Sequence, residues 1–476
     1  MFRDQRLGKT SEEVLKYISS LESDKRIFEA DLLVDKAHLV MLKEQGLISG
    51  ETFSLIINRL EGLRESDLGE GEDIHEAIET YLLAILGPEA GRLQTGRSRN
   101  DQVATSIRLT LREQMLGLME ELHSLIGTLI ERAEDHIDTI IPGFTHTQHA
   151  QPTTLAHHLL AHADAFLRDF DRIEESYIRI NKSPLGSAAF ASTGFKIDRH
   201  RTCKLLGFDS LIENTMDAVS TRDFILEVLS DLAILMVNLS KISEELILWS
   251  TSEFGYLEFS NQYASASSIM PQKKNPDTAE LARAKAGSVI GSLVSALTIC
   301  KAIPMSYNRD LQEVTPHLWN GMDRTRGTIR IIDGCVQTLK FNVEQLAKGS
   351  IAGFSTATEL ADSLVRITGM PFRTAHHVVG RIAAKGEKPT LKEIDSIAQE
   401  IASLKPSEYG FSVLDIEKAL DPKSNIAMRS GIGGPSPSET KRMIEARIKM
   451  LADHFERLER MSKQANAAID HLRKIK

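Results

Sequence analysis

The sequence is poor in the features that mark secreted, disulfide-rich and membrane-spanning proteins. Its 476 residues include three cysteines, Cys203, Cys300 and Cys335, which fit no disulfide framework, CxxC pair or metal-ligand spacing. A reducing, cytoplasmic compartment is therefore expected. No apolar run approaches the roughly 20 residues that a membrane span requires. The first residues, MFRDQRLGKTSEE, lack the apolar core of a signal peptide.

Aromatic residues and an excess of positive charge are also lacking. Aromatic side chains make up 5% of the chain, and the formal net charge is -9. The acidic balance and the absence of a basic stripe argue against nucleic-acid binding. Scarce aromatics, with plentiful Leu, Ala, Glu and Ile, favour helices over sheets. An anionic ligand would have to be held by local cations rather than by the field of the whole protein.

Long helical patterns dominate the middle of the chain and predict an all-α fold with a central bundle of long helices. Apolar residues recur at three- and four-residue steps over 101–137, 153–180, 218–252, a stretch beginning at Asn275, and 316–348. The third pattern is apolar on more than one face, which predicts burial among several helices and a symmetric oligomer.

Glycine-punctuated stretches flank these helices and suggest three helical domains. We place them at about 1–98, 99–348 and 349–476. Short helices and glycine turns are expected in the first domain and again after Gly349.

The stretch ASSIMPQKKNPDTAE combines hydroxyls, two lysines and an amide in a loop that leads into a helix. Pro271 and Pro276 exclude regular helix across it. Asn275 is predicted to cap the following helix with Pro276 in its first turn. Free N–H groups at that end, beside Lys273 and Lys274, predict an anion site. The alternative is a capped surface turn with solvated lysines.

The segment THTQHAQPTTLAHHLLAHA holds five of the fifteen histidines, so a metal site must be weighed. His158 and His162 stand four residues apart, on one face of a predicted helix. However, no HExxH motif is present and no cysteine is near. We therefore expect no metal site, and a structural role for His157, His158 and His162.

Six further segments, together with the loop ASSIMPQKKNPDTAE, resemble those of a known family. They are GEDIHEAIE, TGRSRNDQVAT, PGFTHTQHAQP, SPLGSAA, STRDF and YNRDLQE. In these segments and in SSIMPQKKNPD the chain resembles the argininosuccinate lyases of the fumarase/aspartase superfamily. The resemblance implies a carbon–nitrogen lyase that splits argininosuccinate into arginine and fumarate by β-elimination, without metal or organic cofactor. It also implies a homotetramer with a twenty-helix core, whose active sites each draw on three subunits.

The resemblance assigns the reacting groups. Ser267 is the base that takes the proton, with Ser268 a weaker candidate. Lys273 and Asn275 stabilise the doubly charged carboxyl that forms. His146 is oriented by Glu280 and protonates the leaving nitrogen or relays a proton through water. From its position alone, Glu280 is also compatible with an ordinary acid in the first turn of a helix.

The same resemblance assigns the groups that hold substrate. Arg97 and Arg99 alternate, so one of them should point inward. Arg99 is expected to hold a carboxylate, and His75 is either a substrate residue or a surface histidine among acids. The expected substrate-binding set is Ser20, His75, Ser98, Arg99, Asn100, Thr145, Asn275, Tyr307 and Gln312, of which Tyr307, Gln312 and Ser20 grip the arginine half.

Two positions depart from the family pattern. Ala266 stands where a glycine is usual, which predicts a slightly different closed loop. Thr315 stands where a lysine is frequent, so Arg309 must compensate or substrate must bind more weakly. Two other functions stay open on the sequence: another fumarate-releasing enzyme such as an adenylosuccinate lyase, and a non-catalytic relative like the lens crystallins.

Overall fold

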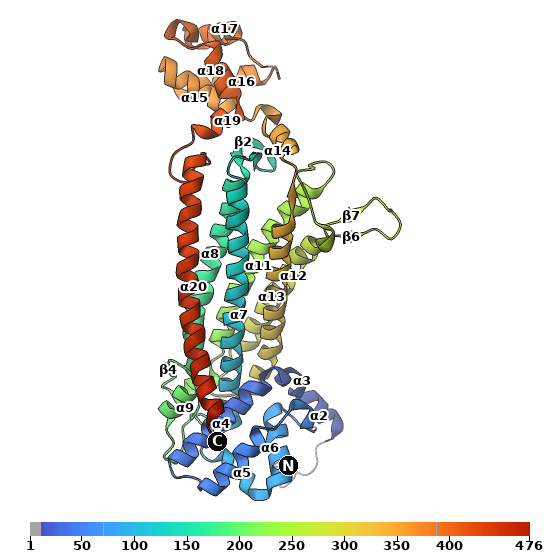
Figure 1. The fold of residues 1–476 in the computed structure, drawn as a ribbon, viewed down its shortest axis with the longest axis vertical. Helices are drawn as coiled ribbons and strands as arrows, with labels where there is room; N and C mark the ends of the chain where they lie inside the picture. Colours follow the sequence, from blue (N-terminus) through green and yellow to red (C-terminus); the bar gives the residue numbers. More distant parts are fainter. Residues whose placement is uncertain (1–10, 70, 387) are drawn as a thin grey trace.

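Five long helices form the central bundle of the molecule. The computed structural model describes residues 11–476 except 70 and 387. Residues 1–10, on which the expectation of no signal peptide rests, lie outside that description. The long helices follow the predicted patterns and run side by side (Figure 1): α7 (Arg99–Asp135), α8 (Leu155–Ile180), α11 (Asp223–Ser250), α12 (Asp277–Cys300) and α13 (Val314–Thr338).

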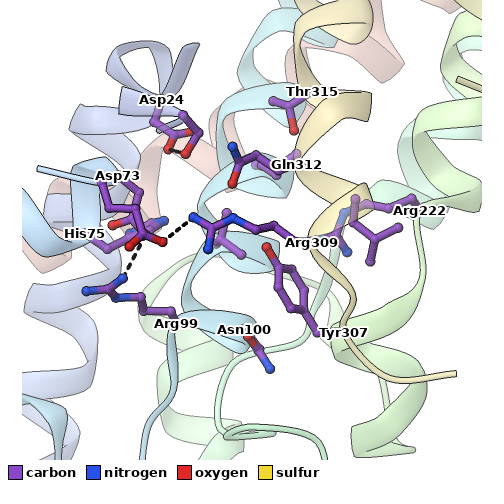
Figure 2. A pocket seen from close by; sticks show the side chains of 15 residues that line it. Asp24, Asp73, His75, Arg99, Asn100, Arg222, Tyr307, Arg309, Gln312 and Thr315 are labelled. Carbon is purple, nitrogen blue, oxygen red and sulfur yellow. Dashed lines mark hydrogen bonds and ion pairs between the residues drawn. The ribbon is translucent and has the colours of Figure 1, made fainter. Parts of the chain in front are cut away.

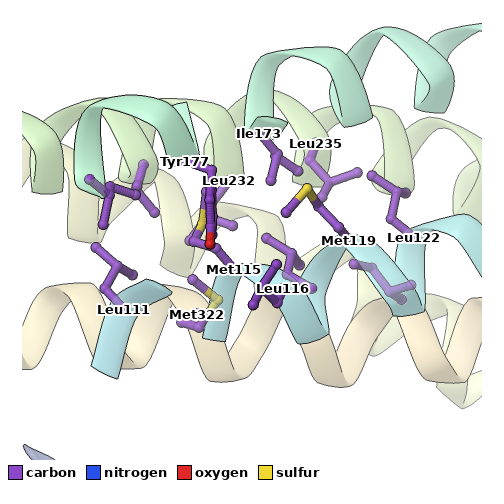
Figure 3. Packing of buried hydrophobic residues seen from close by; sticks show 14 of the residues in the cluster. Leu111, Met115, Leu116, Met119, Leu122, Ile173, Tyr177, Leu232, Leu235 and Met322 are labelled. Atoms are coloured by element: carbon purple, nitrogen blue, oxygen red, sulfur yellow. The ribbon is translucent and has the colours of Figure 1, made fainter. Parts of the chain in front are cut away.

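A continuous apolar core holds these helices together. Met115, Leu118 and Leu122 of α7 have no exposed surface and pack among α8, α11 and α13. Figure 3 shows Leu232 and Leu235 of α11 directed at the same layer. Burying a large aliphatic side chain contributes about 1.5–3 kcal/mol, so this layer holds the helices side by side.

Short helices form the end of the molecule from which the chain begins (Figure 1). They join the same apolar core through α4 and α7. Their bounds are α2 (Glu12–Ile18), α3 (Leu21–Asp24), η1 (Lys25–Ile27), α4 (Phe28–Glu44), α5 (Gly50–Leu60), η2 (Glu65–Asp67), α6 (Ile74–Leu86) and η3 (Gly87–Gln94). Two further short helices, α9 (Arg199–Leu205) and α10 (Thr215–Ser220), lie between α8 and α11 in sequence.

The opposite end carries a second, separate apolar cluster. It is built from residues between 360 and 419, among them Leu364, Val378 and Ile394. The helices of this end are α14 (Val343–Ser350), η6 (Ala352–Phe354), α15 (Ala357–Thr368), α16 (Phe372–Ala383), α17 (Leu391–Ala402), η7 (Pro406–Tyr409), α18 (Val413–Leu420) and α19 (Pro422–Ala427).

The expectation of only short helices after Gly349 is wrong. The chain ends in α20 (Pro437–Lys474), a 38-residue helix that packs along α7 and returns to the first end of the molecule (Figure 1). Its buried residues are few, with Met443, Ile444 and Leu458 among them. The helix is rich in charged residues, and its few buried apolar side chains lie far apart in the sequence. The domain division at 98 and 348 stays a prediction.

The fold is mostly helical rather than purely so, because four two-stranded ladders interrupt it. One ladder is a hairpin after α7, and another is a hairpin before α12 that projects from the side of the bundle (Figure 1). The strands are β1 (Ile140–Thr145) with β2 (Gln148–Thr154), β3 (Lys182–Ser183) with β4 (Ser210–Leu211), β5 (Leu257–Glu258) with β8 (Lys340–Phe341), and β6 (Ser265–Ala266) with β7 (Lys274–Asn275); η4 (Asn261–Tyr263) and η5 (Arg309–Glu313) are 3-10 turns. In the described part of the chain, no helix has both the length and the apolar character needed to cross a membrane.

Candidate active-site segments

A cavity of about 220 Å³ lies where α7 begins. Its walls come from α3, α6, the first turns of α7 and the segment 307–315 (Figure 2). Six of the predicted substrate-binding residues line it: Ser20, His75, Arg99, Asn100, Tyr307 and Gln312. Ser20 and Gln312, which are 292 positions apart in sequence, therefore meet at one place.

The start of α7 is fixed by a reciprocal cap. The Ser98 hydroxyl accepts a hydrogen bond from the N–H of Asn100, and Asp101 accepts one from the N–H of Ser98 at 3.0 Å. Buried Asp101 also accepts from the N–H groups of Gly186 and Ala188, each at 2.9 Å. This clamp attaches the SPLGSAA segment to the helix end and explains why Ser98 does not line the cavity.

Acidic side chains pair with two of the arginines that line the cavity, Arg99 and Arg309. Arg99 donates to Asp73 at 3.1 Å, and Arg309 pairs with Glu72 (Figure 2). Arg97, by contrast, is fully buried in a pair with Asp35 at 2.6 Å, so Arg99 is the member of the alternating pair that faces the cavity. An incoming substrate carboxylate must therefore compete with Asp73 for Arg99.

His75 is buried rather than a surface histidine, with 3% of its surface exposed. Its Nδ1 lies 2.8 Å from the Asp31 carboxylate, which also accepts from Ser106. Burial alone would lower the pKa of His75, but the Asp31 carboxylate raises it to about 9. A pKa raised in this way favours the charged ring at neutral pH, and among the described residues its buried Nε2 has no hydrogen-bond partner. A cavity-lining cation with an unused N–H is suited to a substrate oxygen.

The sequence did not single out three of the groups around this cavity. Asp24 accepts a hydrogen bond from Ser20, and burial raises its pKa. Asp73 and Arg222 also line the cavity. Asp73 and Arg222 stand inside the motifs GEDIHEAIE and STRDF, so a signal for them existed, whereas no sequence pattern marks Asp24. Thr315 lines the cavity too and is 4% exposed.

Thr145 and His146 lie at the far end of α7. They stand at the turn of the β1–β2 hairpin, where Thr145 pairs with Gln148 across the ladder. His146 and Thr147 both have left-handed backbone angles, with φ of 54° and 57°, as the tightest hairpin turns require. Both predicted residues are exposed. The whole strand β2 separates them from α8.

Ser267 lies just inside the tip of the β6–β7 hairpin. Its Oγ accepts hydrogen bonds from the N–H groups of Met270 at 3.0 Å and Ile269 at 3.3 Å. Two amide donors on one hydroxyl oxygen favour its ionised form. Lys273 is exposed on the returning side of the same tip.

The predicted N-cap at Asn275 is wrong. Asn275 belongs to β7 and pairs with Ser265, while Pro276 occupies the cap position of α12. Asn275 forms part of the ladder because pairing with β6 satisfies its backbone N–H and C=O groups. Ala266 takes strand conformation in β6, so alanine fits there without strain. Glu280 is exposed in the first turn of α12, and within the described chain it forms no hydrogen bond or ion pair with His146.

Comparisons with known proteins identify the family. A lyase family model matches residues 64–291, and a model of the argininosuccinate lyase C-terminal region matches residues 354–427. Argininosuccinate lyase of Methanothrix thermoacetophila is 60% identical over 99% of this chain and 98% of its own length. The chain belongs to the argininosuccinate lyase family.

Further relatives agree with this membership. The argininosuccinate lyase of Methanocaldococcus jannaschii is 50% identical over all of this chain and 98% of its own. A solved structure of EDDS lyase with formate superposes with a TM-score of 0.88 at 33% identity, covering 94% of this chain and 90% of that one. The family, and with it the carbon–nitrogen lyase class, confirms what the sequence motifs indicated.

Proposed function

We propose that the protein cleaves argininosuccinate to arginine and fumarate in a homotetramer whose active sites are shared between copies. The observation that carries the shared-site proposal is the separation of the predicted residues within one chain. Arg99 begins α7, whereas His146 follows its end. A helix of 37 residues is about 55 Å long at 1.5 Å per residue. A substrate far shorter than this helix cannot touch both residues in one copy.

Copies packed with their bundles antiparallel would resolve that separation. The start of one α7 would then lie near the end of another, and a hairpin from a third copy would reach the same place. Five long helices from each of four copies would give the twenty-helix core. Supporting this, α12 carries Ile290, Val294 and Leu297 on one face, exposed by 40%, 57% and 48%. Apolar faces of this kind on long helices are typical of subunit interfaces.

The cavity at the start of α7 fits the arginine half of the substrate. That half carries positive groups, and Asp24, Glu72 and Asp73 line the cavity. Tyr307 and Gln312 line the same cavity, with Gln312 beside Asp24 in Figure 2, and can hydrogen-bond polar substrate atoms. His75 and Arg99 would hold carboxylates. Ser98 and Asn100 act mainly by fixing where Arg99 begins the helix.

The β6–β7 hairpin would supply the base. Removing a proton beside a carboxylate places two negative charges on one carboxyl group, so the step needs cations and donors at that position. Lys273 and Asn275 would provide them. The Ser267 alkoxide, which takes the proton, would be stabilised by the two amide N–H groups at its oxygen. His146, oriented by Glu280 of another copy, would deliver a proton as nitrogen leaves.

The test is direct. Purified protein is mixed with argininosuccinate or with adenylosuccinate, and fumarate formation is followed by ultraviolet absorbance. Release from argininosuccinate alone is expected. Release from adenylosuccinate alone would contradict the substrate assignment, and no release from either by a folded oligomer would indicate the non-catalytic alternative.

A further inference from the structure

Three side chains from two helices converge away from the candidate active-site residues. His158 and His162 stand on one face of α8. Both direct Nε2 at the same oxygen of Glu245 in α11, each at 2.7 Å. One nitrogen or oxygen from each of the three residues lies within 4.8 Å of the others. Their side chains are 27%, 15% and 39% exposed, so an ion can reach the cluster from solvent.

Sequence spacing could not reveal this group. No HExxH motif or nearby cysteine accompanies the histidines, so the sequence alone predicts a structural role for them. The third member follows His162 by 83 residues and meets it only because α8 and α11 are neighbours in the bundle. Bundles commonly build metal sites this way, from side chains on facing helices.

Two interpretations of the cluster differ in what holds it together. In the first, both imidazoles donate an N–H to one carboxylate oxygen and clamp the helices without an ion. In the second, the three lone pairs face a cation. A tetrahedral zinc ion at 2.0–2.2 Å from each ligand sets neighbouring ligand atoms about 3.3 Å apart. The observed 2.7 Å contacts would thus open by only about 0.6 Å.

We propose that His158, His162 and Glu245 form a site for a divalent transition-metal cation such as Zn²⁺. Two imidazoles and one carboxylate suit Zn²⁺ and Co²⁺ and disfavour Mg²⁺, which prefers an all-oxygen shell. Three protein ligands leave a position for water. The Trp249 ring lies 4.9 Å from that of His158 and restricts its movement, which helps to preorganise the site.

The position of the site suggests what the ion does. It lies in the first two turns of α8, directly after the β1–β2 hairpin that carries His146. A bound cation would tie this end of α8 to α11 and so brace the hairpin. The role is structural, and the site takes no part in the elimination.

Metal titration of the full-length protein tests the proposal. The protein is freed of metal with EDTA and exchanged into chelator-free buffer. Zn²⁺ is then added with calorimetric detection, and Co²⁺ with detection of its visible absorption bands. One ion per chain and Co²⁺ bands of tetrahedral type are expected. Mg²⁺ should give no signal, and bound Zn²⁺ should raise the melting temperature.

Matched variants locate the ion. His162→Ala and Glu245→Gln each remove one ligand and should weaken Zn²⁺ binding by at least about tenfold. His157→Gln is the control, because His157 hydrogen-bonds Thr153 and Gly433 instead and should leave binding unchanged. If one variant fails to fold, the other still reports. Absence of binding to the parent protein, or equal binding to all variants, would overturn the proposal and leave the hydrogen-bonded clamp.

Discussion

His75 illustrates how a buried polar network sets the charge of one side chain. Asp31, which holds it, also accepts hydrogen bonds from Gln102 and Ser106 of α7. The motif GEDIHEAIE indicated the histidine, but its burial and its partner could not be foreseen. Asp31 stands 44 residues away in sequence, in a helix without a distinctive motif. Such pairs become visible only when the fold brings the helices together.

The His75 pair predicts a pH dependence of stability. Its pKa is raised from 6.5 to about 9 in the folded protein. Its stabilising contribution is therefore complete below about pH 6.5 and is lost as pH rises through 9. Each pKa unit corresponds to about 1.4 kcal/mol, so the loss amounts to a few kcal/mol at most.

Urea unfolding at several pH values between 6 and 10 measures this loss. The His75→Gln variant keeps a hydrogen-bond donor but does not titrate, so its curve accounts for every other group. The parent should lose more stability than the variant across this range. Parallel curves would show that His75 is not charged in the folded protein.

Thr315 predicts a change in substrate affinity. It lines the cavity at the position where the family resemblance leads to an expected lysine, and nearby Arg309 is engaged with Glu72 and the carbonyl oxygen of Ile18. Thr315→Lys should lower KM for argininosuccinate because an added ammonium can meet the amino-acid carboxylate. Thr315→Met is the matched variant without charge and should not lower KM. An unchanged KM in the lysine variant would mean that Arg309 already fills the role.

At the scale of elements, the hairpin β6–β7 is the feature that sequence reasoning described least well. Its prolines and small polar residues indicated a loop, and a four-residue ladder forms there instead. Residues such as Lys and Asn have low strand propensity, and two-residue strands are too short for periodicity to register. The hairpin nevertheless gives Ser267 its two amide donors, which no residue pattern encodes.

That geometry leads to a prediction for Ser267. Ser267→Ala should lower kcat by about 10²–10⁴-fold, the usual worth of a positioned base, while KM changes little. Ser268→Ala is the matched control, because Ser268 carries the neighbouring hydroxyl and is exposed. Steady-state kinetics with argininosuccinate measures both. Near-normal turnover in Ser267→Ala would move the base to another residue.

The long helices were the most predictable elements. Their apolar residues repeat over about six turns or more, and α7, α8 and α11 each begin within five residues of the predicted position. The helix α20 escaped because most of its surface is charged and faces solvent. The central helices stood out by the number of their apolar residues, which several neighbours bury, whereas α20 on the outside of the bundle has few of them.

At the scale of the whole molecule, the sequence could name the predicted residues but not how they meet. Six line the cavity at the start of α7, Thr145 and His146 stand past its far end, and Ser267 lies on the projecting hairpin. The motifs identify the residue at each position, but they say nothing of the distances between these residues in the fold. One copy of the chain holds three separate parts of a site, and neighbouring copies must complete each site.

Complementation between inactive variants tests this requirement most directly. Ser267→Ala and His146→Asn are co-expressed with different tags, and doubly tagged oligomers are purified. If each site takes these two residues from different copies, roughly a quarter of the sites in a random mixture contain both intact. Doubly tagged oligomers should then recover a comparable share of parent activity, while each variant alone stays inactive. No recovery in a folded mixed oligomer would contradict the shared site.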